Sequence, residues 1–516
     1  MVDVKIAILV VSVIFNFVGC EKVVVCYYGT WATYRHGLGK FDVSNINTDL
    51  CTHLVYAFAG ITSQGAMVSL DPYLDLPDNW GRDNFWQFTD LKKKNPKLKT
   101  LLAVGGWNEG SYKYSIMAAN AELRKTFISS VLSMLTKFNF DGLDLDWEYP
   151  NRRDTVYGKA DIANFSNLLK ELREIFDKYG YLLTSAVSAV RDSASLSYDI
   201  PTISKYLDYI NIMTYDMHGA WDSVTGHNAA LHNGEGDEGY DRQSLYTVDV
   251  ALEYWLEQGC PPEKIVLGVP FYGRTFTLKD ANFNSVRAPA NGAGLAGPYT
   301  ATNGFMGYNE FCNKLQTESW TVKFDAQAKV PYAFRDKYWV SYDDPDSIRS
   351  KVEFGLKYNI AGIMVWSIET DDFHNVCGGG DFPLLRAVNN ALYGYSNANE
   401  STTTTSTLST STFTSSTASS STASHNAENS TVLTTTDSIS KETTPGTSDS
   451  SDTTENTSIC KEEGYEADPT DCACFYVCLR DVSGNLTAVK FNCPSSLYWD
   501  KNLSVCNYPN LTECNV

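Results

Sequence analysis

Eight short runs of apolar and β-branched residues recur along the chain, separated by longer stretches. Such runs are typical of strands that are buried on both faces, as in a parallel sheet. Amphipathic patterns that predict helices lie between several of them. Eight strands alternating with helices predict a protein of the α/β class with a (β/α)8 barrel, or TIM barrel. The predicted strands are 23–28, 52–59, 100–105, 140–147, 182–189, 208–215, 265–271 and 361–368, and helices are expected at 121–137, 164–179, 244–258 and 346–357.

The connection between the seventh and eighth predicted strands is too long for a single helix. It runs from 272 to 360 and is rich in Tyr, Phe and turn residues. We therefore expect a small α+β insertion over roughly 275–340, between strand 7 and helix 7 of the barrel. The insertion should emerge at the C-terminal face of the barrel, which is where active sites of this fold lie.

The N-terminus has the pattern of a secretory signal peptide. An apolar run from Ile6 to Val18 is followed by a small-residue cleavage site at Gly19-Cys20. This run is too short to span a bilayer as a helix. We expect residues 1–20 to be removed and the mature chain to be secreted into an extracellular, oxidising compartment.

Composition predicts the domain boundaries. A chain of 516 residues exceeds what one ordinary core holds. Residues 397–458 are mostly Ser and Thr, which cannot bury enough apolar surface to fold, so they predict an extended, O-glycosylated linker. The expected domains are the signal peptide at 1–20, the catalytic barrel at 21–396, the linker at 397–458 and a small module at 459–516.

The formal net charge of −20 limits the possible partners. Nucleic acids and anionic membranes bind basic surfaces, so we expect neither as a partner. The charge fits a neutral or cationic substrate. Solubility alone is an alternative explanation for it.

Three carboxylates alternate with apolar residues in the fourth predicted strand. Side chains of a strand alternate between its faces, so Asp144, Asp146 and Glu148 should point together into the barrel. Crowded like charges cannot all ionise, and at least one pKa should rise. Glu148 is the nearest of the three to the open end of the barrel. A carboxylic acid there could protonate the leaving oxygen of a glycosidic bond.

Two other interpretations of this segment were considered. A solvated acidic loop would not alternate so strictly with Leu and Trp. A site for a hard metal ion is the remaining alternative. The seven His are scattered and no H-E-x-x-H motif occurs, so zinc is not indicated. We expect neither a metal nor a cofactor.

The segment from Asp141 to Glu148, DGLDLDWE, resembles the D-x-x-D-x-D-x-E signature of glycoside hydrolase family 18, the chitinases. Many family members have Ser where Ala103 stands, which is a mild departure. The resemblance covers residues 22–394. Further stretches resemble family motifs in the same order, namely 102–108 (LAVGGWN), 213–219 (MTYDMHG), 268–274 (GVPFYGR) and 362–367 (GIMVWS).

The resemblance implies a substrate-assisted, retaining mechanism. Glu148 would protonate the glycosidic oxygen, and the 2-acetamido carbonyl of the substrate would attack the anomeric carbon. Asp146 would orient the acetamide N–H, and Asp144 would share a proton with Asp146. Tyr215 would donate a hydrogen bond to the acetamido oxygen. Water activated by Glu148 would then complete the hydrolysis.

The resemblance also implies a cleft that binds sugars. Trp366 would form its floor, with Trp31 and Trp221 as stacking platforms. Phe58, Met213 and Trp366 could instead be plain barrel core, because they lie in apolar strands. The other implied substrate contacts are Tyr27, Gly105, Trp107, Asn108, Asp216, Tyr272 and Arg274.

Seven cysteines crowd into the last segment, which predicts a disulfide framework in a small domain. Their spacing resembles the peritrophin-A chitin-binding domain, or carbohydrate-binding module family 14. Cys474 departs from that pattern, and either Cys472 or Cys474 could take the bridge. Tyr498, Trp499 and Tyr508 are candidates for stacking on chitin or, alternatively, for a small aromatic core.

Disulfide pairs are implied by the two resemblances. In the barrel, Cys260 is left over as a buried free thiol. The implied pairs are Cys26–Cys51 and Cys312–Cys377 in the barrel, and Cys460–Cys478, Cys472–Cys514 and Cys493–Cys506 in the module.

Together these features predict a secreted, monomeric endochitinase that binds chitin and chito-oligosaccharides. A chitinase-like lectin is the main alternative, and such relatives lose the final Glu of the motif. Glu148 is present here. A hydrolase of N-glycans is a third possibility, which the chitin-binding module disfavours.

Overall fold

A computed structural model describes residues 21–394, 460–461, 464–480, 486–493, 498–501 and 505–507. The chain divides into two compact units at residues 407 and 408, and each unit is treated by itself. The predicted signal peptide and linker lie outside the described residues. Within the described ranges, no helix is both long and apolar enough to span a bilayer.

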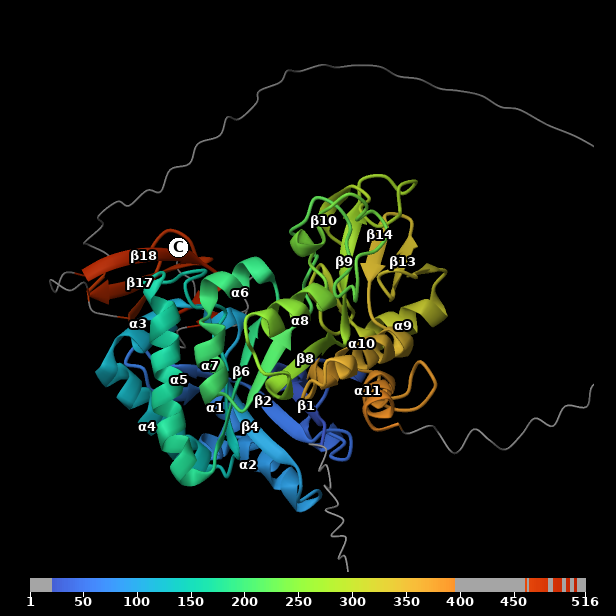
Figure 1. Cartoon of the computed structure of the whole chain (residues 1–516). Coiled ribbons are helices and arrows are strands. Elements are labelled where there is room, and N and C mark those ends of the chain that lie inside the picture. Colours follow the sequence, from blue (N-terminus) through green and yellow to red (C-terminus); the bar gives the residue numbers. More distant parts are fainter. Residues whose placement is uncertain are drawn as a thin grey trace, which may run out of the picture. The chain divides into compact units, whose positions relative to one another are not determined.

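The first unit is built on a closed parallel barrel of eight strands, as the sequence predicted (Figure 1). The strand order is β1-β15-β8-β7-β6-β5-β4-β2, and pairing of β1 with β2 closes the ring. A short strand β3 adds antiparallel to β2. The strands are β1 (Val23–Gly29), β2 (His53–Ile61), β3 (Met67–Ser69), β4 (Lys99–Gly105), β5 (Gly142–Asp146), β6 (Leu182–Ser188), β7 (Tyr209–Met213), β8 (Ile265–Pro270) and β15 (Gly362–Trp366).

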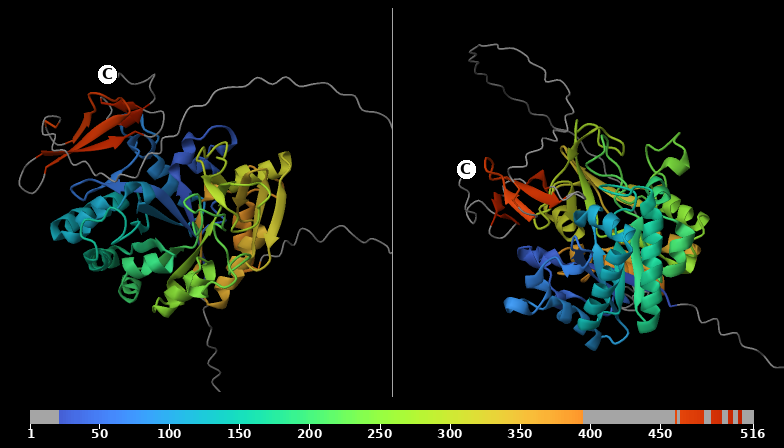
Figure 2. Two further views of the ribbon diagram at one scale, coloured as in Figure 1. Left: turned by 90° about the horizontal axis from the view of Figure 1, so that it is seen from above. Right: turned by 90° about the vertical axis from the view of Figure 1, so that its left-hand side faces the viewer.

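Helices follow the barrel strands and cover them from outside (Figure 1, Figure 2). Helix α10 shows why such a helix starts where it does, since Asp344 accepts the N–H groups of Asp346 and Ser347 and Pro345 occupies the first turn. The helices around the barrel are α1 (Pro72–Asp75), α2 (Asn84–Thr89), α3 (Tyr112–Ala119), α4 (Ala121–Lys137), α5 (Ala160–Tyr179), α6 (Arg191–Ser197), α7 (Ile200–Tyr206), α8 (Val248–Glu257), α10 (Pro345–Lys357) and α11 (Pro383–Tyr393). Short 3-10 helices are η1 (Thr30–Tyr34), η2 (Gly37–Gly39), η3 (Val43–Asn45), η4 (Asp78–Trp80), η5 (Asp90–Lys93), η6 (Trp107–Glu109), η7 (Arg242–Ser244), η8 (Pro262–Lys264) and η9 (Ile368–Thr370).

Alternation of side chains along the strands divides the barrel into two hydrophobic layers. Leu143, Leu145 and Trp147 point outward and pack in the large core formed with the helices. Tyr27 and Met364 point inward and belong to a smaller cluster inside the ring. Polar side chains on β5 therefore point into a closed, apolar interior.

The long connection after β8 forms the predicted α+β insertion, a lobe beside the barrel (Figure 1). Its antiparallel sheet has the order β10-β9-β14-β13-β12, with β11 paired to β9. The sheet begins directly after β8, slightly earlier than the predicted start at 275. Its elements are β9 (Tyr272–Leu278), β10 (Ala290–Ala293), β11 (Phe305–Gly307), α9 (Tyr308–Thr317), β12 (Thr321–Asp325), β13 (Val330–Arg335) and β14 (Tyr338–Ser341).

Two disulfides fix the first unit, and they are the pairs implied by the family resemblance. Cys26 of β1 joins Cys51, and Cys312 of α9 joins Cys377. Cys260 is buried and forms no disulfide.

The second unit contains two small antiparallel sheets held by disulfides. Cys460 pairs with Cys478. Cys472 is also disulfide-bonded, as is Cys493. The predicted partner of Cys472 is Cys514, and the predicted partner of Cys493 is Cys506. Cys514 and the side chain of Cys506 lie outside the described residues. The strands are β16 (Gly464–Ala467), β17 (Cys474–Arg480), β18 (Leu486–Asn492), β19 (Tyr498–Asp500) and β20 (Val505–Asn507).

Trp499 lies inside the second unit. It is 6% exposed and stacks on Phe475 with a centroid distance of 4.0 Å. This agrees with the aromatic-core alternative for Trp499. Tyr498 is half-buried, and Tyr508 lies outside the described residues. Tyr465 of this unit is exposed, and no pattern in the sequence marked it as a candidate for stacking on chitin.

Candidate active site

Asp144 is held in the barrel interior by three neutral donors from three other strands. It accepts hydrogen bonds from the hydroxyl of Tyr27 on β1 (2.7 Å), the hydroxyl of Thr184 on β6 and the Nδ2 of Asn211 on β7 (3.1 Å). Burial raises the pKa of Asp144, and these three hydrogen bonds oppose the rise. The donors fix the carboxyl group in one orientation.

Asp146 is the last residue of β5, and it is also buried. Burial raises its pKa well above the usual range, and the nearby charges of Glu148 and Asp144 raise it further. Its Oδ1 is buried and accepts no hydrogen bond from the described protein groups. Burial and the two neighbouring carboxylates thus both favour the protonated form of Asp146.

Glu148 lies two residues past the end of β5 and is half-buried. Burial raises its pKa from 4.5 to about 7. The charge of Asp216 raises this pKa as well, whereas a hydrogen bond with Tyr149 and the charge of Arg153 lower it. Near neutral pH both forms of Glu148 are populated, so the same carboxyl group can donate a proton and later accept one.

Tyr215 enters the barrel interior just after β7. Its ring lies 6.1 Å from that of Tyr272, and its hydroxyl donates to the sulfur of Met364 at 3.5 Å. Gly268 on β8 makes room for it, because a Cβ there would lie 3.0 Å from the Tyr215 ring and 2.4 Å from the Ile212 carbonyl. The sequence GVPFYGR thus leaves space for the tyrosine that follows the neighbouring strand.

Asp216 joins two of the predicted substrate contacts. Its Oδ1 accepts hydrogen bonds from the Tyr272 hydroxyl (2.6 Å) and from the Nε of Arg274 (2.7 Å). The guanidinium of Arg274 also lies over the ring of Trp221, 5.1 Å from its centroid. Asp216, Tyr272, Arg274 and Trp221 therefore form one connected group, called here the Asp216 cluster.

Aromatic rings gather around Trp366 at the end of β15. Trp31, Phe58 and Tyr27 lie with centroids 6.1, 5.8 and 5.5 Å from Trp366. Phe58, Trp366 and Met213 are half-buried and pack on the inner cluster, so they share core packing with partial exposure. Trp31, Trp107 and Trp221 keep 43%, 57% and 59% of their surface exposed, as stacking platforms require.

Gly105, the last residue of β4, brings the backbone close to Asp146. Gly105 has a positive φ of 119°, and a Cβ there would lie 2.1 Å from the Asp146 carbonyl oxygen. Gly105 thus serves close backbone approach. Beyond it, Trp107 carries the guanidinium of Arg153 at 3.8 Å from its ring centroid, and Asn108 is exposed.

Sequence reasoning missed Thr184, Asn211 and Arg153. Thr184 and Asn211 are polar residues on the inward face of otherwise apolar strands, so the alternation that revealed Asp144 could also have revealed them. Arg153 lies in a loop, and its sequence position carries no comparable signal.

The described residues contain one group of side chains with metal-ligand spacing, Cys312, Asp372 and Cys377. The two cysteines are joined in a disulfide, which removes their thiolates as ligands.

A TIM barrel that holds a glutamate of raised pKa just beyond two buried aspartates, with aromatic rings nearby, has the arrangement expected of a barrel glycoside hydrolase. Residues 23–371 match the family model described as glycosyl hydrolases family 18. The chain belongs to this family. Residues 460–514 match the chitin binding Peritrophin-A domain.

Relatives of known structure or curated name share the whole barrel. The chain is 44% identical to "Probable chitinase 2" of Drosophila melanogaster over an aligned length of 402 residues, and the match covers 72% of this chain and 80% of that one. It is 63% identical to the crystal structure of the Group IV chitinase of Ostrinia furnacalis, with a TM-score of 0.71, covering 72% of this chain and 100% of that one. Human YKL-39, described as a pseudo-chitinase with retained chitooligosaccharide binding, is 38% identical with a TM-score of 0.66, at 72% and 100% coverage.

Proposed function

We propose that this chain is a secreted, monomeric endochitinase that cleaves β-1,4 bonds between N-acetylglucosamine units with retention of configuration. The observation that carries the proposal is the presence of Glu148, with a pKa raised to about 7, directly beyond two buried aspartates. The names of the insect relatives and the peritrophin-A match support chitin as the substrate.

The placement of Glu148, Asp146, Asp144 and Tyr215 supports the substrate-assisted mechanism that the family resemblance implies. Protonated Glu148 gives its proton to the glycosidic oxygen. The acetamido oxygen of the bound sugar then attacks the anomeric carbon, which breaks the bond to the leaving sugar and forms a cyclic oxazolinium ion. Asp146 accepts a hydrogen bond from the acetamide N–H, and the hydroxyl of Tyr215 donates to the acetamide oxygen. Ionised Glu148 finally takes a proton from water as the water oxygen bonds to the anomeric carbon, which breaks the bond from that carbon to the acetamido oxygen and opens the oxazolinium ring.

Asp144 assists this reaction through Asp146, which lies two residues further along the chain. Its three donors stabilise an ionised form, while Asp146 above it is driven towards the protonated form. A proton can therefore be shared between the two aspartates as positive charge develops on the sugar. This supports the role assigned to the pair by the family resemblance.

A chitin-binding protein without turnover is the second candidate. The likeness to YKL-39 favours it, because that barrel is described as binding chitooligosaccharides while being a pseudo-chitinase. Glu148, Asp146, Asp144 and Tyr215 are all present here, which supports turnover.

Replacement of the acid separates the two candidates. Glu148→Gln should reduce release of products from chitin oligomers by on the order of 10²–10⁴-fold or more, since a neutral amide cannot donate the proton. Oligomer binding should remain. Glu171→Gln on α5 is a matched control, because Glu171 pairs with Arg124 on the outside of the barrel. Near-normal release of products by Glu148→Gln would disprove the mechanism. If the wild-type protein itself releases no products, the second candidate, a chitin-binding protein without turnover, is favoured.

A further inference from the structure

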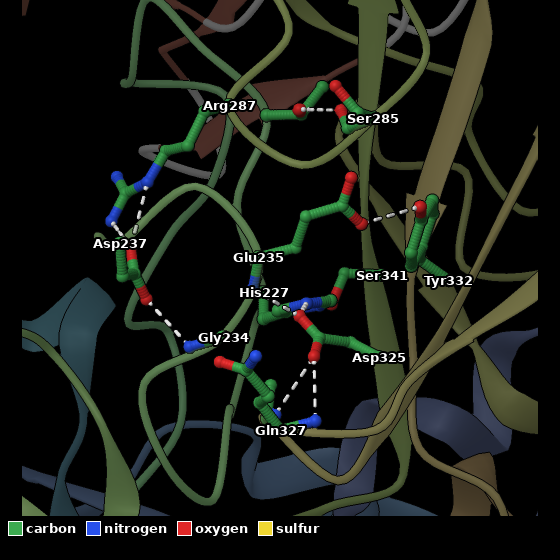
Figure 3. Close-up of polar contacts among 12 residues, drawn as sticks. His227, Gly234, Glu235, Asp237, Ser285, Arg287, Asp325, Gln327, Tyr332 and Ser341 are labelled. Atoms are coloured by element: carbon green, nitrogen blue, oxygen red, sulfur yellow. Dashed lines mark hydrogen bonds and ion pairs between the residues drawn. The ribbon is translucent and has the colours of Figure 1, made fainter.

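The loop between β7 and α8 is anchored to the insertion. The Nε2 of His227 lies 3.2 Å from the Oδ2 of Asp325 at the end of β12, and this oxygen also accepts the N–H of Glu235 at 2.8 Å (Figure 3). Arg287 and Asp237 form an ion pair at 2.6 Å in the same view. The insertion therefore fixes the loop on both sides of His227 and the residue that follows it, Asn228.

Asn228 is fully buried, and its polar groups are all engaged. Its N–H donates to the hydroxyl oxygen of Ser341 (2.8 Å), and its carbonyl accepts the N–H of Met217 (3.0 Å). Its side-chain Oδ1 accepts the N–H of Asp216 (3.0 Å), and its Nδ2 donates to the carbonyl of Tyr272 (3.1 Å). One side chain thus ties the backbones that follow β7 and β8.

The two residues whose backbones Asn228 contacts, Asp216 and Tyr272, also contact each other through their side chains. Asp216 has a left-handed backbone with a φ of 55°, which a non-glycine residue adopts only when its surroundings hold it there. In this conformation its carboxylate accepts the hydroxyl of Tyr272 at 2.6 Å. The Asn228 amide therefore closes a ring of contacts through Asp216 and Tyr272.

We infer that Asn228 is a positioning residue, which holds Asp216 in its left-handed turn so that the Asp216 cluster stays directed towards Glu148 and the bound sugar. The inference rests on the proposed function, because Glu148 must be the acid. It assigns Asn228 no contact with substrate. Its effect passes through the placement of Asp216 and Tyr272.

Loss of the Asn228 side-chain hydrogen bonds should change the pH dependence of kcat/KM. The charge of Asp216 raises the pKa of Glu148, and Asp146 is the neighbouring carboxyl group that interacts with it. The charge of Arg153 and the hydrogen bond with Tyr149 lower the pKa of Glu148. Among the described residues, the other titratable groups that interact with Glu148 are Tyr198 and Tyr215. If Asp216 turns away, one negative charge is lost and the pKa of Glu148 falls. The alkaline limb of kcat/KM then moves to lower pH.

The test compares Asn228→Ala and Asn228→Leu with the wild-type enzyme on soluble chitin oligomers. Both variants remove the two side-chain hydrogen bonds, and Leu keeps the volume in case the cavity left by Ala impairs folding. We expect kcat/KM to fall about 10–100-fold. The alkaline limb should move down by roughly half a pH unit. Asp216→Asn should move it in the same direction, and Asn228→Leu added to Asp216→Asn should cause no further movement.

Thr225→Val is the matched structural control. Thr225 is fully buried in the same loop, where its hydroxyl donates to the Ser285 carbonyl and accepts the Ala288 N–H. This variant loosens the anchor but leaves Asp216 alone, so it should lower the thermal midpoint without moving the alkaline limb. If Thr225→Val moves the limb as far as Asn228→Leu, or if a folded Asn228→Leu leaves it in place, the inference is wrong. Failure of the proposed function would appear separately, as wild-type turnover that survives Glu148→Gln.

Discussion

The acidity of Glu148 is set by burial and by two charges of opposite sign, Asp216 and Arg153. Burial raises the pKa of Glu148, and the hydrogen bond with Tyr149 and the charge of Arg153 limit this rise. Arg153 also stacks on Trp107, so a residue that lowers the pKa of Glu148 touches a predicted substrate contact. A sugar bound at Trp107 would therefore act on the protonation of Glu148 through this guanidinium.

Removal of Arg153 gives a prediction with a definite sign. Arg153→Gln removes a positive charge that lowers the pKa of Glu148, so the alkaline limb of kcat/KM should move to higher pH by about half a unit. KM should rise as well, because the stacking on Trp107 is lost. Arg152→Gln, next in the chain and exposed, is the control and should leave the profile unchanged. The pH dependence of kcat/KM is measured for both variants. A shift of the alkaline limb to lower pH in Arg153→Gln would contradict the prediction.

The period of two along β5 made the inward placement of Asp144 and Asp146 predictable from sequence. Their partners were not predictable in the same way. Thr184 lies opposite Asp144 on the neighbouring strand β6, and Asn211 lies one strand further along the sheet on β7, so these contacts join residues forty and sixty-seven positions away. Asn228 is further removed, since it acts from a loop held by the insertion and no local pattern marks it.

At the scale of elements, buried apolar runs identified all eight barrel strands, because parallel strands are apolar on both faces. Shorter elements escaped this reasoning. Strand β3 has only three residues, and α8 begins at Val248 rather than 244 because Thr247 is extended and a separate 3-10 turn, η7, precedes it. The antiparallel strands of the insertion mix apolar and polar residues, so the sequence predicted the insertion as a whole from the length of the connection but not its individual strands.

The cap of α10 offers a test of local stability. Asp344→Ala removes the acceptor for two N–H groups in the first turn and should destabilise the barrel by about 1 kcal/mol. Asp346→Ala in the same turn removes only an exposed pair with Arg349 and should cost less. Thermal midpoints of the two variants measure the difference. Equal midpoints would show that the cap contributes little.

At the scale of the whole molecule, the second unit should act on insoluble substrate through linkage. Tethering a chitin-binding module raises the local concentration of chitin without altering the catalytic residues. A chain ending at Tyr395 should therefore cleave soluble oligomers at the full-length rate but bind and degrade insoluble chitin less well. Sedimentation with chitin particles measures binding, and full-length Glu148→Gln serves as the inactive, binding control. Equal sedimentation of both lengths would refute the anchoring role.

The position of Glu148 past the end of β5 has a consequence for how this scaffold can change over evolutionary time. Asp144 and Asp146 lie within the strand, where each replacement would orphan buried donors or leave a cavity. Glu148 belongs neither to the strand nor to the hydrophobic core. Under the proposed mechanism, replacement of Glu148 would therefore abolish turnover at low structural cost while the rings around Trp366 persist. A lineage can pass from hydrolase to carbohydrate receptor by a single replacement at that one position.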